Sequence, residues 1–158
     1  MSPTCQSECA RANRGRGRSL ALTPPAGRCR YVAFVVAVYR DAVTRGVPIP
    51  DLKPANIGFF AEPGGGAWRL IDHDMMAPSA DDTVVGTFGR PPPEMAEELS
   101  WIAITRWAAL VTALWPVMDP AARRAVLTPA ATNRHAVVMA AAAEHPNLTE
   151  MMSNVGLV

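Results

Sequence analysis

The hydrophobic residues of this chain are grouped into long runs that predict helices. Across residues 31–44 nearly every position is apolar, and a run of this length without a break favours a buried helix over a strand. Across residues 94–114 apolar side chains recur every three or four positions, which is typical of a helix, and Pro116 should end it. The alanine-rich residues 119–143 predict one or two further helices. The expected fold is therefore mainly α.

Two shorter apolar runs in the middle of the chain predict strands. They cover residues 57–60 and 68–71. The segment between them contains Pro63 followed directly by a run of glycines, which is a strong turn signal. We therefore expect one short β-hairpin beside the helices.

Residues 1–30 lack this pattern and are expected to form a disordered tail, with a single domain over residues 31–158. Arginines alternate there with Gly, Ser and Pro, a composition typical of disordered segments. Such a tail is either a nuclear-localisation or RNA-binding arm or a solvated extension. Because no aromatic residue is interleaved for base stacking, the sequence favours the solvated extension.

Charge and cysteine usage narrow the class of protein. The net charge of +1 gives no electrostatic attraction toward nucleic acid or acidic membranes, so neither is an expected partner. The cysteines, Cys5, Cys9 and Cys29, are odd in number and lack the spacing of a metal site, which fits a reducing compartment. No apolar run is long enough to span a bilayer. We expect an intracellular protein.

Residues 51–56, just before the first predicted strand, contain the residue types that phosphoryl transfer needs. Asp51 can orient a hydroxyl nucleophile and accept its proton, and Lys53 can neutralise phosphate charge. The side-chain oxygen of Asn56 can bind a magnesium ion.

Residues 49–56 resemble the catalytic loop of protein kinases, H-R-D-L-K-P-x-N, with Ile49 and Pro50 in place of the His and the Arg. Residues 70–74 resemble the family's next motif, L-I-D-F-G, with His73 in place of the Phe and Asp74 in place of the Gly. Residues 86–94 align without a gap on G-T-x-x-Y-x-A-P-E, the end of the activation segment. The chain is therefore similar to the C-terminal lobe of a Ser/Thr protein kinase, and the flanks of its loop resemble the divergent kinases of large DNA viruses.

The resemblance assigns roles to particular residues. It implies that Asp51 and Lys53 are catalytic, and that Asn56 and Asp72 bind the Mg²⁺ that bridges the phosphates of ATP. It also implies that Thr87 bridges Asp51 and Lys53, the alternative being a turn threonine bonded to local backbone. His73, beside Asp72, either packs as the family's Phe does or binds metal weakly.

The family also has two structural anchors near the end of this segment. Glu94 stands where the family has a structural ion pair, and its candidate partners here are Arg123, Arg124 and Arg134. The alternative is a solvated residue that the dipole at a helix N-terminus favours. The second anchor is an Asp near the start of the following helix that holds the catalytic loop, and near that place the sequence offers only Glu97 or Glu98.

Other parts of a kinase are missing from this sequence. Lys53 is the only lysine in the chain, so the family's second lysine, which contacts the α- and β-phosphates, has no counterpart. No Gly-rich phosphate loop is present, and a complete kinase domain needs about 250 residues. We therefore expect a chain without the N-terminal lobe, with a protein substrate or a partner that supplies that lobe. The alternative is a catalytically dead, kinase-derived interaction module.

Overall fold

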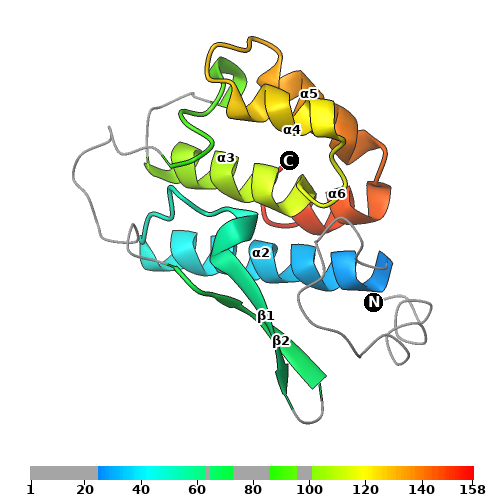
Figure 1. Cartoon of the computed structure of the whole chain (residues 1–158). Coiled ribbons are helices and arrows are strands. Elements are labelled where there is room, and N and C mark those ends of the chain that lie inside the picture. The colour runs from blue at the N-terminus through cyan, green and yellow to red at the C-terminus, as the bar shows by residue number, and fades with distance from the viewer. Residues whose placement is uncertain (1–24, 63–64, 73–85, 96–100) are drawn as a thin grey trace.

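The computed structural model describes residues 25–62, 65–72, 86–95 and 101–158 (Figure 1). These residues are mainly helical and include one two-stranded antiparallel hairpin, as the sequence predicted. The elements are α2 (Pro25–Arg45), the 3-10 helix η2 (Pro54–Asn56), β1 (Ile57–Glu62), β2 (Gly65–Leu70), the 3-10 helix η3 (Pro93–Met95), α3 (Trp101–Leu114), α4 (Pro120–Leu127), α5 (Arg134–Ala143) and α6 (Pro146–Ser153). No helix within these ranges is long and apolar enough to cross a membrane.

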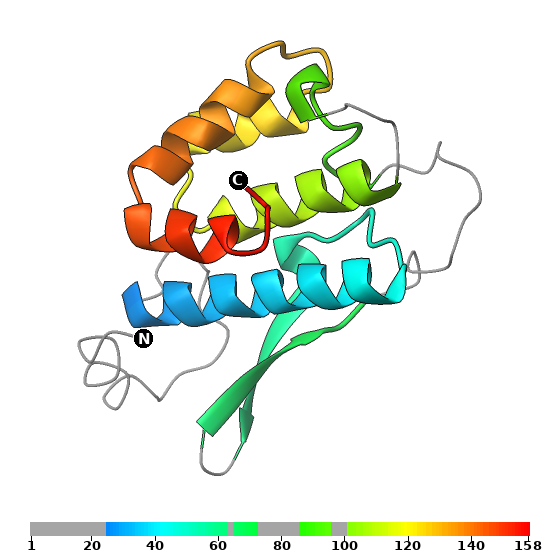
Figure 2. The ribbon, with the colours of Figure 1, turned by 180° about the vertical axis from the view of Figure 1, so that it is seen from behind.

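Helix α3 lies at the centre of the molecule. It runs beside α2 in the opposite direction, and α4 and α5 cover its other side, as two opposite views show (Figures 1 and 2). Because it is surrounded, α3 is buried on nearly every face, and Trp107 at its middle is completely buried. A helix that is apolar all round must be enclosed in this way. The segments that carry Asp51 and Thr87 are bonded to this helix.

The hairpin is attached to α2 through aromatic side chains. In the antiparallel register Phe59 lies opposite Trp68, and their rings meet edge to face with centroids 5.0 Å apart. The Trp68 ring in turn contacts the buried Tyr31 of α2, at 5.2 Å between centroids. Beyond this contact the hairpin extends away from the helices (Figures 1 and 2).

Several boundaries differ from those that the hydrophobic pattern predicted. Helix α2 begins at Pro25, inside the range expected to be tail, and residues 1–24 lie outside the described residues. Of the helix expected over residues 94–114, the structure shows a 3-10 turn at Pro93–Met95 and helix α3 over Trp101–Leu114, and residues 96–100 lie outside the described residues. Helix α3 ends at Leu114, just before Pro116, as predicted. Residues 119–143 form two helices, α4 and α5.

Candidate functional site

Asp51 and Lys53 lie on the loop that connects α2 to β1. Gly46 ends α2 with a φ of 66°, a left-handed conformation that glycine adopts without strain. Between the two polar residues, Leu52 points into the core and is 1% exposed. Successive side chains of an extended segment point to opposite sides, so burying Leu52 turns Asp51 and Lys53 to the same, outer side.

Two buried threonines of α3 fix this loop on both sides of Asp51. The backbone N–H of Ile49 donates to Oγ1 of Thr105 at 3.1 Å, and the hydroxyl of Thr112 donates to the carbonyl of Leu52 at 2.8 Å. Thr105 and Thr112 are two helical turns apart and therefore lie on the same face of α3. The sequence pattern did not single out this pair, because a threonine in a helix carries no local sign of a partner 56 or 60 positions away. Glu97 and Glu98, considered instead as the anchor, lie outside the described residues.

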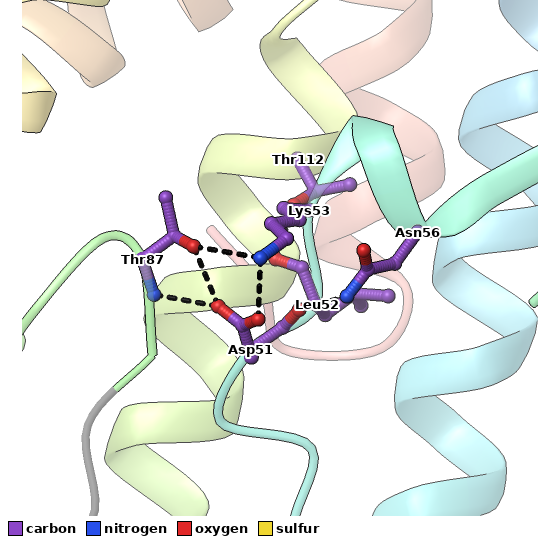
Figure 3. Close-up of polar contacts among 6 residues, drawn as sticks. All are labelled: Asp51, Leu52, Lys53, Asn56, Thr87 and Thr112. Carbon is purple, nitrogen blue, oxygen red and sulfur yellow. Dashed lines mark hydrogen bonds and ion pairs between the residues drawn. The ribbon is translucent and has the colours of Figure 1, made fainter. Parts of the chain in front are cut away.

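Thr87 joins Asp51 and Lys53 in one network of hydrogen bonds (Figure 3). The Thr87 backbone N–H and hydroxyl both donate to Asp51 Oδ1, at 2.6 and 2.7 Å. The Lys53 ammonium donates to Asp51 Oδ2 at 2.6 Å and to the Thr87 hydroxyl oxygen at 3.1 Å. The predicted bridge between Asp51 and Lys53 through Thr87 is therefore present in the structure.

The network keeps the Asp51 carboxyl ionised. Partial burial raises its pKa, but the hydrogen bonds from Lys53 and Thr87 and the positive charge of Lys53 together outweigh burial. The pKa of Asp51 consequently lies below its ordinary value, and at neutral pH the group is a carboxylate that accepts hydrogen bonds and donates none.

Thr87 reaches Asp51 because the residue before it is glycine. A Cβ on Gly86 would lie 2.1 Å from the carbonyl oxygen of Pro50 and 2.5 Å from the Cα of Asp51, closer than atoms can approach. The chain then turns, with the Gly89 N–H donating to the Gly86 carbonyl at 2.9 Å. Backbone contact between the two segments thus brings Thr87 within hydrogen-bonding distance of the carboxylate.

Arg134 holds the far side of this turn and does not pair with Glu94. Its guanidinium donates to the carbonyl oxygens of Phe88 and Arg90. Arg123, another candidate partner, donates to the carbonyl of Trp115 at 2.9 Å. Glu94 itself is exposed in η3, and no ion pair joins it to any of the three candidate arginines within the described ranges.

Asn56 and Asp72 lie at the base of the hairpin. The backbone N–H of Ile71 donates to the Asn56 carbonyl at 3.0 Å, so Asp72 follows directly on the residue that pairs with Asn56. The Asn56 amide nitrogen donates to the Asp51 carbonyl at 3.2 Å, and its oxygen points away from that carbonyl (Figure 3). Asp72 is exposed, and His73 lies outside the described residues.

Asn56 and Asp72 offer an amide oxygen and a carboxylate, which are both ligand types that Mg²⁺ accepts. Mg²⁺ in proteins usually retains several waters and binds through one or two carboxylates together with substrate phosphates. The described ranges contain no cluster of three or more His, Cys, Asp or Glu side chains that could hold a metal by themselves. A metal ion at Asn56 and Asp72 would therefore need further ligands, such as the oxygens of a bound phosphate.

No family model, curated protein or solved structure matches this chain. The function is therefore inferred from the geometry of the site and the sequence motifs.

Proposed function

We propose that this chain carries one half of a phosphoryl-transfer site of the Ser/Thr protein kinase type, and that it acts with a partner that supplies the nucleotide-binding lobe. The fold would then correspond to a kinase C-terminal lobe. The observation that carries the proposal is the network of Asp51, Lys53 and Thr87.

The unused hydrogen-bonding capacity of this network suits a hydroxyl next to a phosphate. A carboxylate has about four acceptor positions, and three on Asp51 are taken by Lys53 and Thr87. An ammonium group has about three donors, and Lys53 uses two of them on the same two residues. Within the described residues this leaves one acceptor on Asp51 Oδ2 and one donor on Lys53, on atoms 2.6 Å apart.

These two positions define the roles of the residues. Asp51 would accept the proton of a Ser or Thr hydroxyl on the substrate. At the same time the hydroxyl oxygen would form a bond to the γ-phosphorus of ATP, and the bond between this phosphorus and ADP would break. Lys53 would donate to an oxygen of the transferred phosphoryl group and stabilise its charge. Asn56 and Asp72 would hold Mg²⁺, which when bound neutralises part of the phosphate charge.

The need for a partner follows from the composition and from the hairpin. With Lys53 already bonded to Asp51 and Thr87, the chain has no second lysine for the α- and β-phosphates. Phe59, Phe60 and Ile71 of the hairpin region are each between 44% and 52% exposed, an apolar surface that a partner lobe would cover. The same two features favour the alternative function, an interaction module that binds a partner through the hairpin and transfers no phosphate.

Complementation distinguishes these two functions. The chain is mixed with a separately produced kinase N-terminal lobe, and transfer of labelled phosphate from ATP to a Ser/Thr peptide mixture is measured. Transfer should require both polypeptides and should be lost in Asp51→Asn, whereas Asp41→Asn, at an exposed aspartate paired with Arg45, should leave it unchanged. Transfer that survives in Asp51→Asn would overturn the proposed role of this carboxylate. No transfer from any mixture, with the hairpin still binding the lobe, would favour the interaction module.

A further inference from the structure

The contact between Thr87 and Asp51 depends on how the residues that follow Thr87 are held. Phe88 is buried, with 3% of its surface exposed, whereas Thr87 is exposed. The carbonyl oxygen of Phe88 accepts from the indole N–H of Trp107 at 3.1 Å and from the guanidinium of Arg134. Two side chains from two different helices therefore fix the peptide unit between Phe88 and Gly89, one residue beyond Thr87.

Arg134, the first residue of α5, makes the more extensive of these contacts. Besides the Phe88 carbonyl it donates to the Arg90 carbonyl at 3.0 Å, so it spans the turn that carries Thr87. Its guanidinium carbon also lies 5.0 Å from the centre of the Trp107 ring, a cation–π distance. Arg134 is 5% exposed, which is unusual for an arginine.

The buried charge makes this arrangement sensitive to the position of residues 88–90. Burial lowers the pKa of Arg134, and no carboxylate forms an ion pair with it within the described residues. The two carbonyl oxygens and the Trp107 ring are thus the groups that compensate the charge. If residues 88–90 moved away, a buried cation would lose most of its polar contacts, which is costly.

We propose that Arg134 is a positioning residue: it holds residues 88–90 against α3 so that the backbone N–H and the hydroxyl of Thr87 meet the carboxylate of Asp51. The helical part after α3 is thereby coupled to the candidate catalytic carboxylate through the turn at Phe88, which Arg134 contacts across 46 residues of sequence. The structural part of this proposal stands on contacts alone, and only its catalytic meaning rests on the proposed function.

Amide hydrogen exchange, measured by NMR without nucleotide, tests this coupling. In Arg134→Met the long side chain remains but its donors are lost, and the protection of the Thr87 amide should fall tenfold or more. The Ile49 amide is an internal reference. Ile49 lies in the loop that carries Asp51, and its N–H donates to Thr105 of α3 rather than to a group bonded to Arg134. Its protection should change by less than threefold.

Arg123→Met is a matched control. Arg123 also donates to a backbone carbonyl and lies over a tryptophan ring, at 5.4 Å, but its partner for both contacts is Trp115 at the end of α3. The Trp115 ring also packs on Phe88, with centroids 5.6 Å apart, so this variant perturbs the packing around Phe88 but removes no donor to residues 88–90. The Thr87 amide should therefore stay protected. If Arg134→Met does not fold, Arg134→Lys replaces it, because lysine keeps the charge but cannot reproduce the planar fork that reaches both carbonyls.

Two results would overturn the proposal. Equal loss of protection at Thr87 and Ile49 would mean that Arg134 only stabilises the fold, and unchanged protection of Thr87 in both Arg134 variants would mean that it does not position Thr87. Since the exchange is measured on the chain alone, failure of the complementation assay leaves this result standing. Conversely, phosphate transfer in the complemented wild-type chain can succeed even where the coupling is absent.

Discussion

Gly86 and Pro50 touch through their backbones, so closely that a single added carbon on Gly86 would lie 2.1 Å from the Pro50 carbonyl oxygen. Pro50 immediately precedes Asp51, and Gly86 immediately precedes Thr87. The distance between the carboxylate and the hydroxyl is thus set by a contact between main-chain atoms, which adjusts far less than a contact between long side chains.

Gly86→Ala should therefore separate Thr87 from Asp51. We expect the pKa of Asp51 to rise toward its ordinary value, since two of the hydrogen bonds that lower it come from Thr87. The overpacked contact should also cost about 1–3 kcal/mol of unfolding free energy. NMR titration of the aspartate side-chain carboxyls and chemical denaturation measure the two effects. Gly156→Ala is the control. Gly156 has a positive φ of 71°, so alanine is strained there and stability should fall, but no atom lies within 4 Å of the added Cβ and the pKa of Asp51 should not change.

The two threonines of α3 should each contribute measurably to stability. Thr105→Val removes the acceptor of the buried Ile49 N–H, and Thr112→Val removes the donor to the Leu52 carbonyl. A buried polar group left without a partner costs about 1–3 kcal/mol, so each variant should unfold at lower denaturant concentration. Thr128→Val is the control, because the hydroxyl of Thr128 is exposed and donates to the Arg124 carbonyl four residues earlier in the same helical segment. A change in Thr105→Val no larger than in Thr128→Val would contradict the anchoring role.

The stability of the chain should decrease in acid partly because of Asp51. Its folded-state pKa lies below the ordinary value of 3.8, so the ionised form favours the folded state. A group of this kind contributes stability above its unfolded-state pKa and loses that contribution as the pH falls through the folded-state pKa. Denaturation curves between pH 7 and pH 3 should show a weaker pH dependence for Asp51→Asn than for the wild type. Parallel curves for the two proteins would mean that the Asp51 network does not stabilise the fold.

Metal-nucleotide binding should be weak and should depend on Asp72. With Asn56 and Asp72 as the protein ligands, affinity of the isolated chain for MnATP should be on the order of millimolar, because the phosphates must complete the site. A thermal-shift titration should respond to MnATP in the wild type and lose the response in Asp72→Ala. Asp119→Ala is unsuitable as a control, since Asp119 caps α4 through the Ala122 N–H. Asp41→Ala is used as the control instead. If the response to MnATP persists in Asp72→Ala, the metal binds elsewhere.

The exposed aromatic residues of the hairpin should promote self-association of the isolated chain. Phe59 and Phe60 are each 44% exposed, and a two-stranded sheet leaves the outer edges of both strands unpaired. Sedimentation velocity at increasing concentration should show association, and Phe60→Ser should reduce it. Phe60 is the better choice because Phe59 also packs on Trp68. A monomer at all concentrations would argue against an exposed interface here.

The order of apolar and polar residues predicted the helices and strands whose formation depends mainly on neighbouring residues in the sequence. The runs of apolar residues predicted the long helix over residues 31–44, which α2 contains, and the hairpin of β1 and β2. The motif also predicted Thr87 as the partner of Asp51 and Lys53, and the structure places it there. In contrast, the roles of Thr105 and Arg134 depend on residues 44 to 56 positions away. A threonine or an arginine in a helix has the same local pattern whether it binds such a partner or faces solvent.

The anchoring of the Asp51 loop by α3 also has a consequence for biosynthesis. Thr112 follows Leu52 by 60 residues, and Thr105 follows Ile49 by 56. At a synthesis rate of about 5–20 residues per second, the loop leaves the ribosome ~3–12 s before both of its partners have been made. During this interval Ile49 and Leu52 lack the two threonines to which they bond, so the loop that carries Asp51 takes its final conformation only after α3 has been translated.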